Sequence, residues 1–158
     1  MSTTIFGATK DRYYMRQALD QAQKAAALAE VPIGAVVVDE HGAIIATGYN
    51  AVESRQCQTA HAEIIAIDHA CKQYASWRLT GCWIYVTLEP CSMCMGLIRL
   101  SILQGLVYGA ASPLFGFTQH EGQESILYKN NRLIIISSVE QEQSAILLKD
   151  FFQRKRTT

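Results

Sequence analysis

The sequence contains no run of about 18 apolar residues, the length that a membrane-spanning helix requires. Its N-terminus, MSTTIFGATKD, lacks the charged-then-apolar plan of a signal peptide. The formal net charge is zero, so no global field indicates a nucleic-acid or membrane partner, and any electrostatic contact must be local. No Pro/Gly/Ser-rich linker, internal repeat or low-complexity segment interrupts the 158 residues. These absences predict a cytoplasmic protein with no membrane partner, folded as one domain over residues 1–158.

The chain has five cysteines, an odd number that lacks the dense spacing of a secreted disulfide scaffold. Such cysteines are typical of free thiols or metal ligands rather than of disulfides. Cys71 and Cys82 are expected to be buried as small apolar side chains. The other three cysteines are candidates for metal ligands.

Hydrophobic periodicity predicts strands that alternate with helices after an opening helix and hairpin. The predicted strands are 33–38, 43–48, 82–88, 105–110 and 132–138. The predicted helices are 11–29, one that follows Thr59 as its N-cap, one that follows Pro90, and 139–154. This order predicts an α/β fold, a three-layer α/β/α sandwich around a central mixed five-stranded sheet.

Two segments between these elements carry further expectations. Residues 51–58 are predicted to form a polar loop, and residues 111–131 a weakly periodic connection. In the last helix, the apolar spacing predicts burial of Ile146, Leu147, Phe151 and Phe152.

Two titratable residues stand in the first turn of an otherwise apolar helix, TAHAEIIAIDHA. His61 and Glu63 gain nothing there from burial in a core, because titratable groups are costly to bury without a partner. His69 lies about 80° further around the helix and is not expected to share a site with His61. The pattern therefore favours a chemical role for His61 and Glu63.

A second motif, TLEPCSMC, places Cys91 and Cys94 three residues apart at the start of a helix, where both sulfurs share one face. A helix N-terminus lowers the pKa of a thiol and so favours thiolate. In an α/β sheet the N-termini of neighbouring helices gather at one edge, so His61 is expected beside the two thiols. One imidazole and two thiolates form a tetrahedral zinc site with one open position, the arrangement of a catalytic zinc. Glu63 is then placed to move protons.

Three alternatives use the same residues differently. Cys57, four residues before His61, could close the site as a structural Cys₃His zinc module. Cys91 and Cys94 could form a redox dithiol, although this explains neither His61 nor Glu63. Glu89 could be a helix-start carboxylate or a partner of a metal ligand.

The C-terminal tail is the one dense basic segment of the chain. It holds four cations against a single acid, Asp150: Lys149, Arg154, Lys155 and Arg156. Cations near a helix C-terminus suit the helix dipole, so the tail is either a solvated helix end or a local contact for phosphates.

His61-Ala62-Glu63 followed by Pro90-Cys91-Ser92-Met93-Cys94 resembles the signature of the zinc-dependent nucleoside and nucleobase deaminases. The phrases VPIGAVVV, GYN, TAHAEIIAI, YVTLEPCSMCMG, VYGA and DFFQRKR further resemble the bacterial tRNA adenosine deaminases. This resemblance extends from about Tyr14 to Arg156. It implies a cytidine deaminase-like fold and hydrolytic conversion of adenosine to inosine at the wobble position of a tRNA anticodon.

The resemblance also implies roles for individual residues. One Zn²⁺ per subunit would be held by His61, Cys91 and Cys94, with Glu63 as the catalytic proton carrier. Asn50 and the backbone amide of Ala62 would bind the base. The family forms homodimers that bind the tRNA anticodon loop, and Arg154, Lys155 and Arg156 would contact phosphates.

The sequence departs from the family pattern beside the expected site. Cys57-Gln58 stand where the family usually has Asp-Pro, and ASPLFGFTQHEG follows VYGA in place of a charged phrase and a Gly-Ala-Ala-Gly stretch. Ala111, Ser112 and Leu114 replace polar or charged positions. These changes leave a second function open, a deaminase of a free purine or pyrimidine such as guanine or cytosine.

Overall fold

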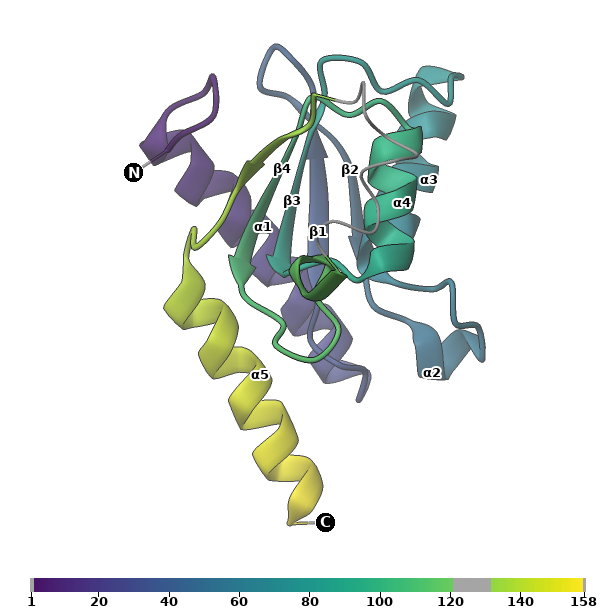
Figure 1. The fold of residues 1–158 in the computed structure, drawn as a ribbon. Helices are drawn as coiled ribbons and strands as arrows, with labels where there is room; N and C mark the ends of the chain where they lie inside the picture. Colours follow the sequence, from purple (N-terminus) through teal and green to yellow (C-terminus); the bar gives the residue numbers. More distant parts are fainter. Residues whose placement is uncertain (1, 121–131, 158) are drawn as a thin grey trace.

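A mixed sheet of five strands forms the centre of the structure, a computed structural model that describes residues 2–120 and 132–157 (Figure 1). The strands are β1 (Gly34–Val38), β2 (Ile44–Tyr49), β3 (Trp83–Leu88), β4 (Gly105–Ala110) and β5 (Ile134–Ile136), in the order β2-β1-β3-β4-β5. β1 runs antiparallel to β2 and β3, whereas β3, β4 and β5 are parallel. The predicted mixed sheet is confirmed.

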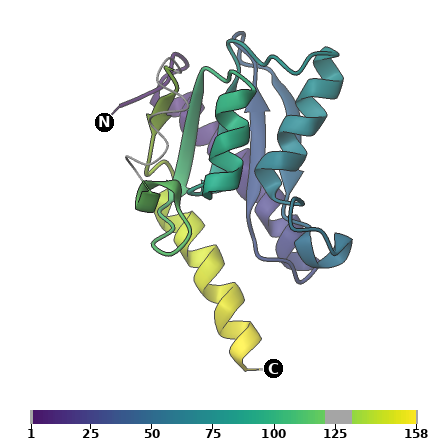
Figure 2. The same cartoon turned by 45° about the vertical axis from the view of Figure 1, so that its right-hand side comes forward.

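Helices cover both faces of this sheet, as Figure 2 shows. α1 (Ala8–Ala27) and α5 (Gln141–Arg156) lie on one face, and α3 (Ala62–Tyr74) and α4 (Ser92–Leu100) on the other. Because side chains alternate along a strand, Ala35 and Val37 of β1 pack with α3 and α4, while Val36 and Val38 pack with α1. The three-layer sandwich predicted from the sequence is therefore confirmed.

The edge of the sheet where β3 and β4 end carries the starts of two helices. His61 is the N-cap residue of α3 and Cys91 that of α4. Gly48 of β2 lets α3 approach closely, since a Cβ there would lie 2.4 Å from the Ala62 carbonyl oxygen. The fold thus brings the residues of both sequence motifs to one edge.

The last helix buries less than the sequence predicts. Phe151 is buried and Leu147 half-buried, but Ile146 is 50% exposed and Phe152 46% exposed, so their predicted burial is wrong. The reason is that α5 covers the sheet only with its first turns, where Ser144 meets Gly109 of β4, and then extends past the edge of the sheet (Figure 1).

Two local predictions are also wrong. Residues 51–58 contain a short helix, α2 (Val52–Arg55), because the carboxylate of Glu30 accepts hydrogen bonds from backbone N–H groups of its first turn. Thr59 does not cap α3; its hydroxyl lies 3.1 Å from Sγ of Cys57. Residues 121–131 of the weakly periodic connection lie outside the described residues. No helix within 2–120 and 132–157 is long and apolar enough to cross a membrane.

Candidate metal centre and substrate pocket

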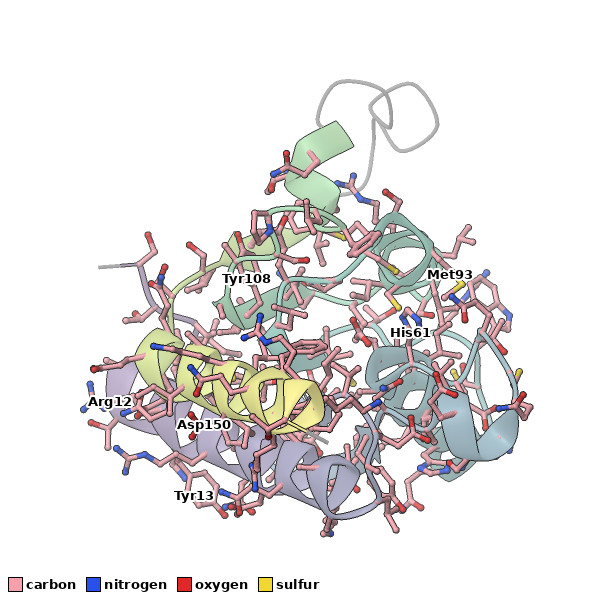
Figure 3. The ribbon with its side chains drawn as sticks, turned by 90° about the horizontal axis from the view of Figure 1, so that it is seen from below. Arg12, Tyr13, His61, Met93, Tyr108 and Asp150 are labelled. Atoms are coloured by element: carbon pink, nitrogen blue, oxygen red, sulfur yellow. The ribbon has the colours of Figure 1, made fainter. Side chains whose placement is uncertain are left out.

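Three side chains with metal-binding atoms meet at the edge where α3 and α4 begin. Nδ1 of His61 lies 3.4 Å from Sγ of Cys94 and 3.7 Å from Sγ of Cys91, and the three atoms all lie within 4.8 Å of one another. Figure 3 looks at this edge and shows His61 near Met93 of α4. The structure thus brings together the residues that the sequence motifs predict.

The spacing of these atoms fits a zinc ion. Tetrahedral zinc, with bonds of about 2.0 Å to nitrogen and 2.3 Å to sulfur, separates nitrogen from sulfur by about 3.5 Å and two sulfurs by about 3.8 Å. The observed separations of 3.4 and 3.7 Å match this requirement without any movement of the helices. One Zn²⁺ per subunit therefore fits the group, which offers three ligand atoms.

The protonation states of these groups also suit a cation. Hydrogen bonds with Cys94 and His61 lower the pKa of the Cys91 thiol to about 4, against the effect of burial. The hydrogen bond with Cys91, together with burial, raises the pKa of Cys94, and the hydrogen bond with Cys91 raises that of His61. These shifts favour the thiolate form of Cys91 and the protonated forms of Cys94 and His61. A metal ion that binds the three groups displaces such protons.

Cys57 is not part of this cluster. Among the described residues, the group of converging metal-binding atoms consists of His61, Cys91 and Cys94. Cys57 is exposed and its Sγ contacts the hydroxyl of Thr59. This arrangement gives no support to the closed Cys₃His module.

A pocket of about 190 Å³ opens beside the cluster. Its wall includes His61, Ala62 and Glu63 of the α3 start, together with Asn50 at the end of β2. Asn50 is 6% exposed, and its side-chain amide donates to the carbonyl oxygen of Val31 at 3.3 Å, which orients it. The N–H of Ala62 belongs to the first turn of α3, where backbone donors have no partner within the helix.

Glu63 is one of two buried carboxyl groups that line this pocket, the other being Glu30. Glu63 is 4% exposed, and burial raises its pKa to about 7. A group that titrates near neutral pH can both accept and return a proton, which is the property required of a general acid and base.

Glu30, which the sequence analysis missed, holds the rim of the pocket. Glu30 is 1% exposed, and its carboxylate accepts hydrogen bonds from the backbone N–H groups of Glu53 (3.1 Å) and Ser54 (2.6 Å). Burial raises the pKa of Glu30, but these hydrogen bonds and the charge of Lys155 outweigh that effect and lower it. No local pattern signals this role, because the partners lie 23 and 24 residues away.

Glu89, whose role the sequence left open, holds the segment 111–118 beside the cysteines. Its buried carboxylate accepts hydrogen bonds from the N–H of Ser112 (2.9 Å) and from the N–H (3.0 Å) and hydroxyl (2.6 Å) of Thr118. Gly116 forms a β-bridge with Cys91, and the N–H of Phe117 donates to the carbonyl oxygen of Pro90. The segment that departs from the family pattern is thus fixed against Cys91, one of the candidate metal ligands.

The basic tail does not enter the pocket. Arg154, Lys155 and Arg156 are exposed on the last turn of α5, outside the residues that line it. Lys155 nevertheless lies close enough to influence Glu30 at the rim, and its Nζ lies 5.2 Å from the ring centre of Phe151. The tail therefore approaches the edge of the site without lining it.

Comparison with known proteins places this site in a family context. A model of the cytidine and deoxycytidylate deaminase zinc-binding region matches residues 8–110. The chain is 42% identical over 151 residues to the tRNA-specific adenosine deaminase of Bacillus subtilis (strain 168), which covers 94% of this chain and 92% of the relative.

Two solved structures extend the comparison. One, from biochemical and structural studies of A-to-I editing by tRNA:A34 deaminases at the wobble position of transfer RNA, is 36% identical with a TM-score of 0.78; the match covers 86% of this chain and 99% of that one. Another, a guanine deaminase from Nitrosomonas europaea, is 22% identical with a TM-score of 0.79, covering 95% and 93% of the two chains. At that identity the second match shows the shared fold alone.

Proposed function

The chain belongs to the zinc-dependent cytidine and deoxycytidylate deaminase family, and within it to the tRNA-specific adenosine deaminases, and from this premise we propose that it hydrolyses adenosine to inosine at the wobble position of a tRNA anticodon. One observation carries the proposal. His61, Cys91 and Cys94 form a cluster with zinc spacing, and His61 also lines a small pocket together with the buried carboxyl group of Glu63.

His61, Cys91 and Cys94 are the proposed ligands of the zinc ion. When bound, zinc lowers the pKa of water at its open position towards neutrality, which supplies the nucleophile at physiological pH. His61 and Cys91 hold their positions because each is the N-cap residue of a helix packed on the sheet.

Glu63 is the proposed proton carrier. Hydrolysis adds the elements of water across C6 and N1 of adenine and then expels the 6-amino group as ammonia, so the site must move protons twice. Glu63 accepts a proton from the water that adds to C6 and delivers it to N1. It then takes the proton of the new C6 hydroxyl and passes it to the amino group, which leaves as ammonia as the C6 carbonyl forms. Its pKa of about 7 suits both directions of transfer.

Asn50 and Ala62 are the proposed partners of the base. The amide of Asn50 and the backbone N–H of Ala62 line the same pocket as Glu63, so they can hydrogen-bond the edge of a ring placed with C6 towards the cluster. Hydrogen-bonding groups of this kind fix the orientation of a ligand in a small pocket.

The proposed substrate segment is the anticodon loop. A pocket of about 190 Å³ takes a base only after it has left the stack, which costs little in a single-stranded loop. Because the formal net charge is zero, phosphate contacts must come from a local patch. Arg154, Lys155 and Arg156, exposed at the edge of the site, are the proposed patch. The cytoplasmic location stays a prediction from the sequence.

We also propose that the protein is a homodimer. On α4, Met93 and Leu100 are seven residues apart and therefore lie on one face, and they are 41% and 60% exposed. Ile102, just past the helix, is 43% exposed. A second copy covering this face would bury the three side chains, and native mass spectrometry of the purified protein tests it.

The test of function is a comparison of substrates. The purified protein is incubated with total tRNA and, separately, with free adenine, guanine, cytosine and their nucleosides, and inosine and ammonia are measured. We expect inosine at the first anticodon position of tRNA. Release of ammonia from a free base, with no inosine in tRNA, favours the second function, a nucleobase deaminase.

A further inference from the structure

The two most exposed large apolar side chains in residues 2–120 and 132–157 are neighbours, and they lie beside the metal cluster. Leu114 is 78% exposed and Phe115 is 73% exposed. The next residue, Gly116, is bridged to Cys91. An aromatic ring is therefore held in solvent within two residues of the backbone that carries a metal-binding sulfur.

This exposure does not result from a loosely held loop. The Glu89 carboxylate accepts three hydrogen bonds from the segment, one from Ser112 and two from Thr118. A Cβ at Gly116 would lie 2.3 Å from the carboxyl carbon of Glu89, so the backbone passes directly over that group. Phe117 is buried edge-on against Tyr108, with ring centres 6.1 Å apart. The fold thus fixes both sides of Phe115 and leaves its ring uncovered.

A polynucleotide substrate requires such a surface. With the target base in a pocket of about 190 Å³ that His61 lines, the nucleotides joined to it must lie outside the pocket, on the surface around it. Bases that have lost their stacking partners are recognised by stacking on aromatic side chains, which is tolerant of sequence because every base has a π-face. The exposed ring of Phe115, one residue from the bridge to Cys91, meets this need without an ordering cost on binding.

We propose that Phe115 is a stacking platform for a base adjacent to the target adenosine. This inference rests on the proposed function and adds a specificity-determining residue to it. The occupant is a base of the single-stranded loop. The clamp formed by Glu89, Gly116 and Thr118 holds the backbone next to the ring in place.

The test uses single-turnover deamination of an anticodon stem-loop at increasing enzyme concentration. Phe115→Ala and Phe115→Leu should raise the half-saturating concentration about 5- to 150-fold, the range that corresponds to loss of one base–aromatic stack, whereas Phe115→Trp should stay within about two-fold. Zinc content and melting temperature should not change, because the side chain is exposed.

Trp77→Ala is the matched control. Trp77 is an exposed aromatic residue, 58% exposed, just past the far end of α3, a helix of 13 residues that spans about 20 Å. Its replacement should leave the half-saturating concentration unchanged. A second readout is direct: 2-aminopurine placed next to the target adenosine should lose fluorescence on binding the parent and should not on binding Phe115→Ala.

Three results overturn the proposal, and they are distinguishable. If the parent deaminates the stem-loop and Phe115→Ala and Phe115→Leu saturate like the parent, the platform is wrong and the function stands. If Phe115→Ala changes the mass of the assembly and not the RNA affinity, Phe115 is a subunit contact. If the parent deaminates free bases and no RNA, the proposed function and the platform are both wrong.

Discussion

Replacing Thr118 by Val removes one hydrogen-bond donor from the buried Glu89 carboxylate and leaves the size of the side chain nearly unchanged. The hydroxyl of Thr118 donates at 2.6 Å to the same oxygen that accepts the Thr118 N–H. A hydrogen bond to a charged group contributes about 1.5 to 3 kcal/mol to stability. We therefore expect Thr118→Val to lower the free energy of unfolding by about that amount.

A second variant, Glu89→Gln, tests whether the stability lost in Thr118→Val comes from the hydrogen bond between Thr118 and Glu89. Its amide oxygen can replace one carboxylate oxygen, but its NH₂ group then faces the N–H of Ser112 and leaves that donor without an acceptor, at a cost of about 1 to 3 kcal/mol. A hydrogen bond to a neutral oxygen is roughly half as strong as one to a carboxylate. Thr118→Val should therefore cost less in the Glu89→Gln protein, by about 1 kcal/mol.

Urea unfolding of the parent, the two single variants and the double variant at saturating zinc measures this coupling. Thr80→Val, at an exposed position in a turn, is the control and should change stability by less than about 0.5 kcal/mol. Amide hydrogen exchange gives a local readout, since the Ser112 and Thr118 N–H groups should lose protection in Glu89→Gln. Costs that add within about 0.5 kcal/mol, with unchanged exchange, would refute the clamp.

Three further predictions concern the proposed site. Glu63→Gln should retain zinc and fold but lose about 10²- to 10⁴-fold in turnover, measured by inosine formation. Near-normal turnover of this variant would show that Glu63 does not transfer the protons. Cys57→Ser should leave zinc content and activity near those of the parent, whereas loss of metal would restore the closed structural site. Replacing Arg154, Lys155 and Arg156 with Ala should weaken tRNA binding and reduce the slope of log affinity against log salt by up to about 2, measured by titration at several salt concentrations. An unchanged slope would show that the tail makes no phosphate contacts and is a solvated helix end.

The metal cluster could be predicted from the sequence because each part of it is local. Cys91 and Cys94 are one helical turn apart, and His61 stands at the start of another helix that follows the sheet. Only their meeting at one edge required the fold, and the alternation of strands and helices supplied it. The same alternation predicted the mixed sheet, whereas the assignment of 1–158 to one domain stays a prediction.

The roles of Glu30 and Glu89 could not be predicted because their partners are distant in the sequence. Glu30 binds backbone groups 23 and 24 residues away, and Glu89 binds groups 23 and 29 residues away. No periodicity encodes such a pairing, since a carboxylate that accepts backbone hydrogen bonds looks the same in sequence as a solvated one.

The errors at Thr59, Ile146 and Phe152 have a related physical origin. An apolar spacing shows which side of a helix is apolar, but not whether another element covers it. α5 extends past the sheet, so Ile146 and Phe152 stay about half exposed. Threonine is a residue type that favours the N-cap position, but the N-cap of α3 is His61, two residues after Thr59, and the Thr59 hydroxyl contacts Cys57 instead.

The most direct test of the account is a zinc titration of the metal-free protein, followed by formation of inosine in tRNA. We predict no activity without metal, a linear rise with added zinc, and saturation at one equivalent per chain, with no recovery in His61→Ala. Deamination of tRNA adenosine by protein shown to be free of metal, or full activity of His61→Ala without bound zinc, would contradict the account.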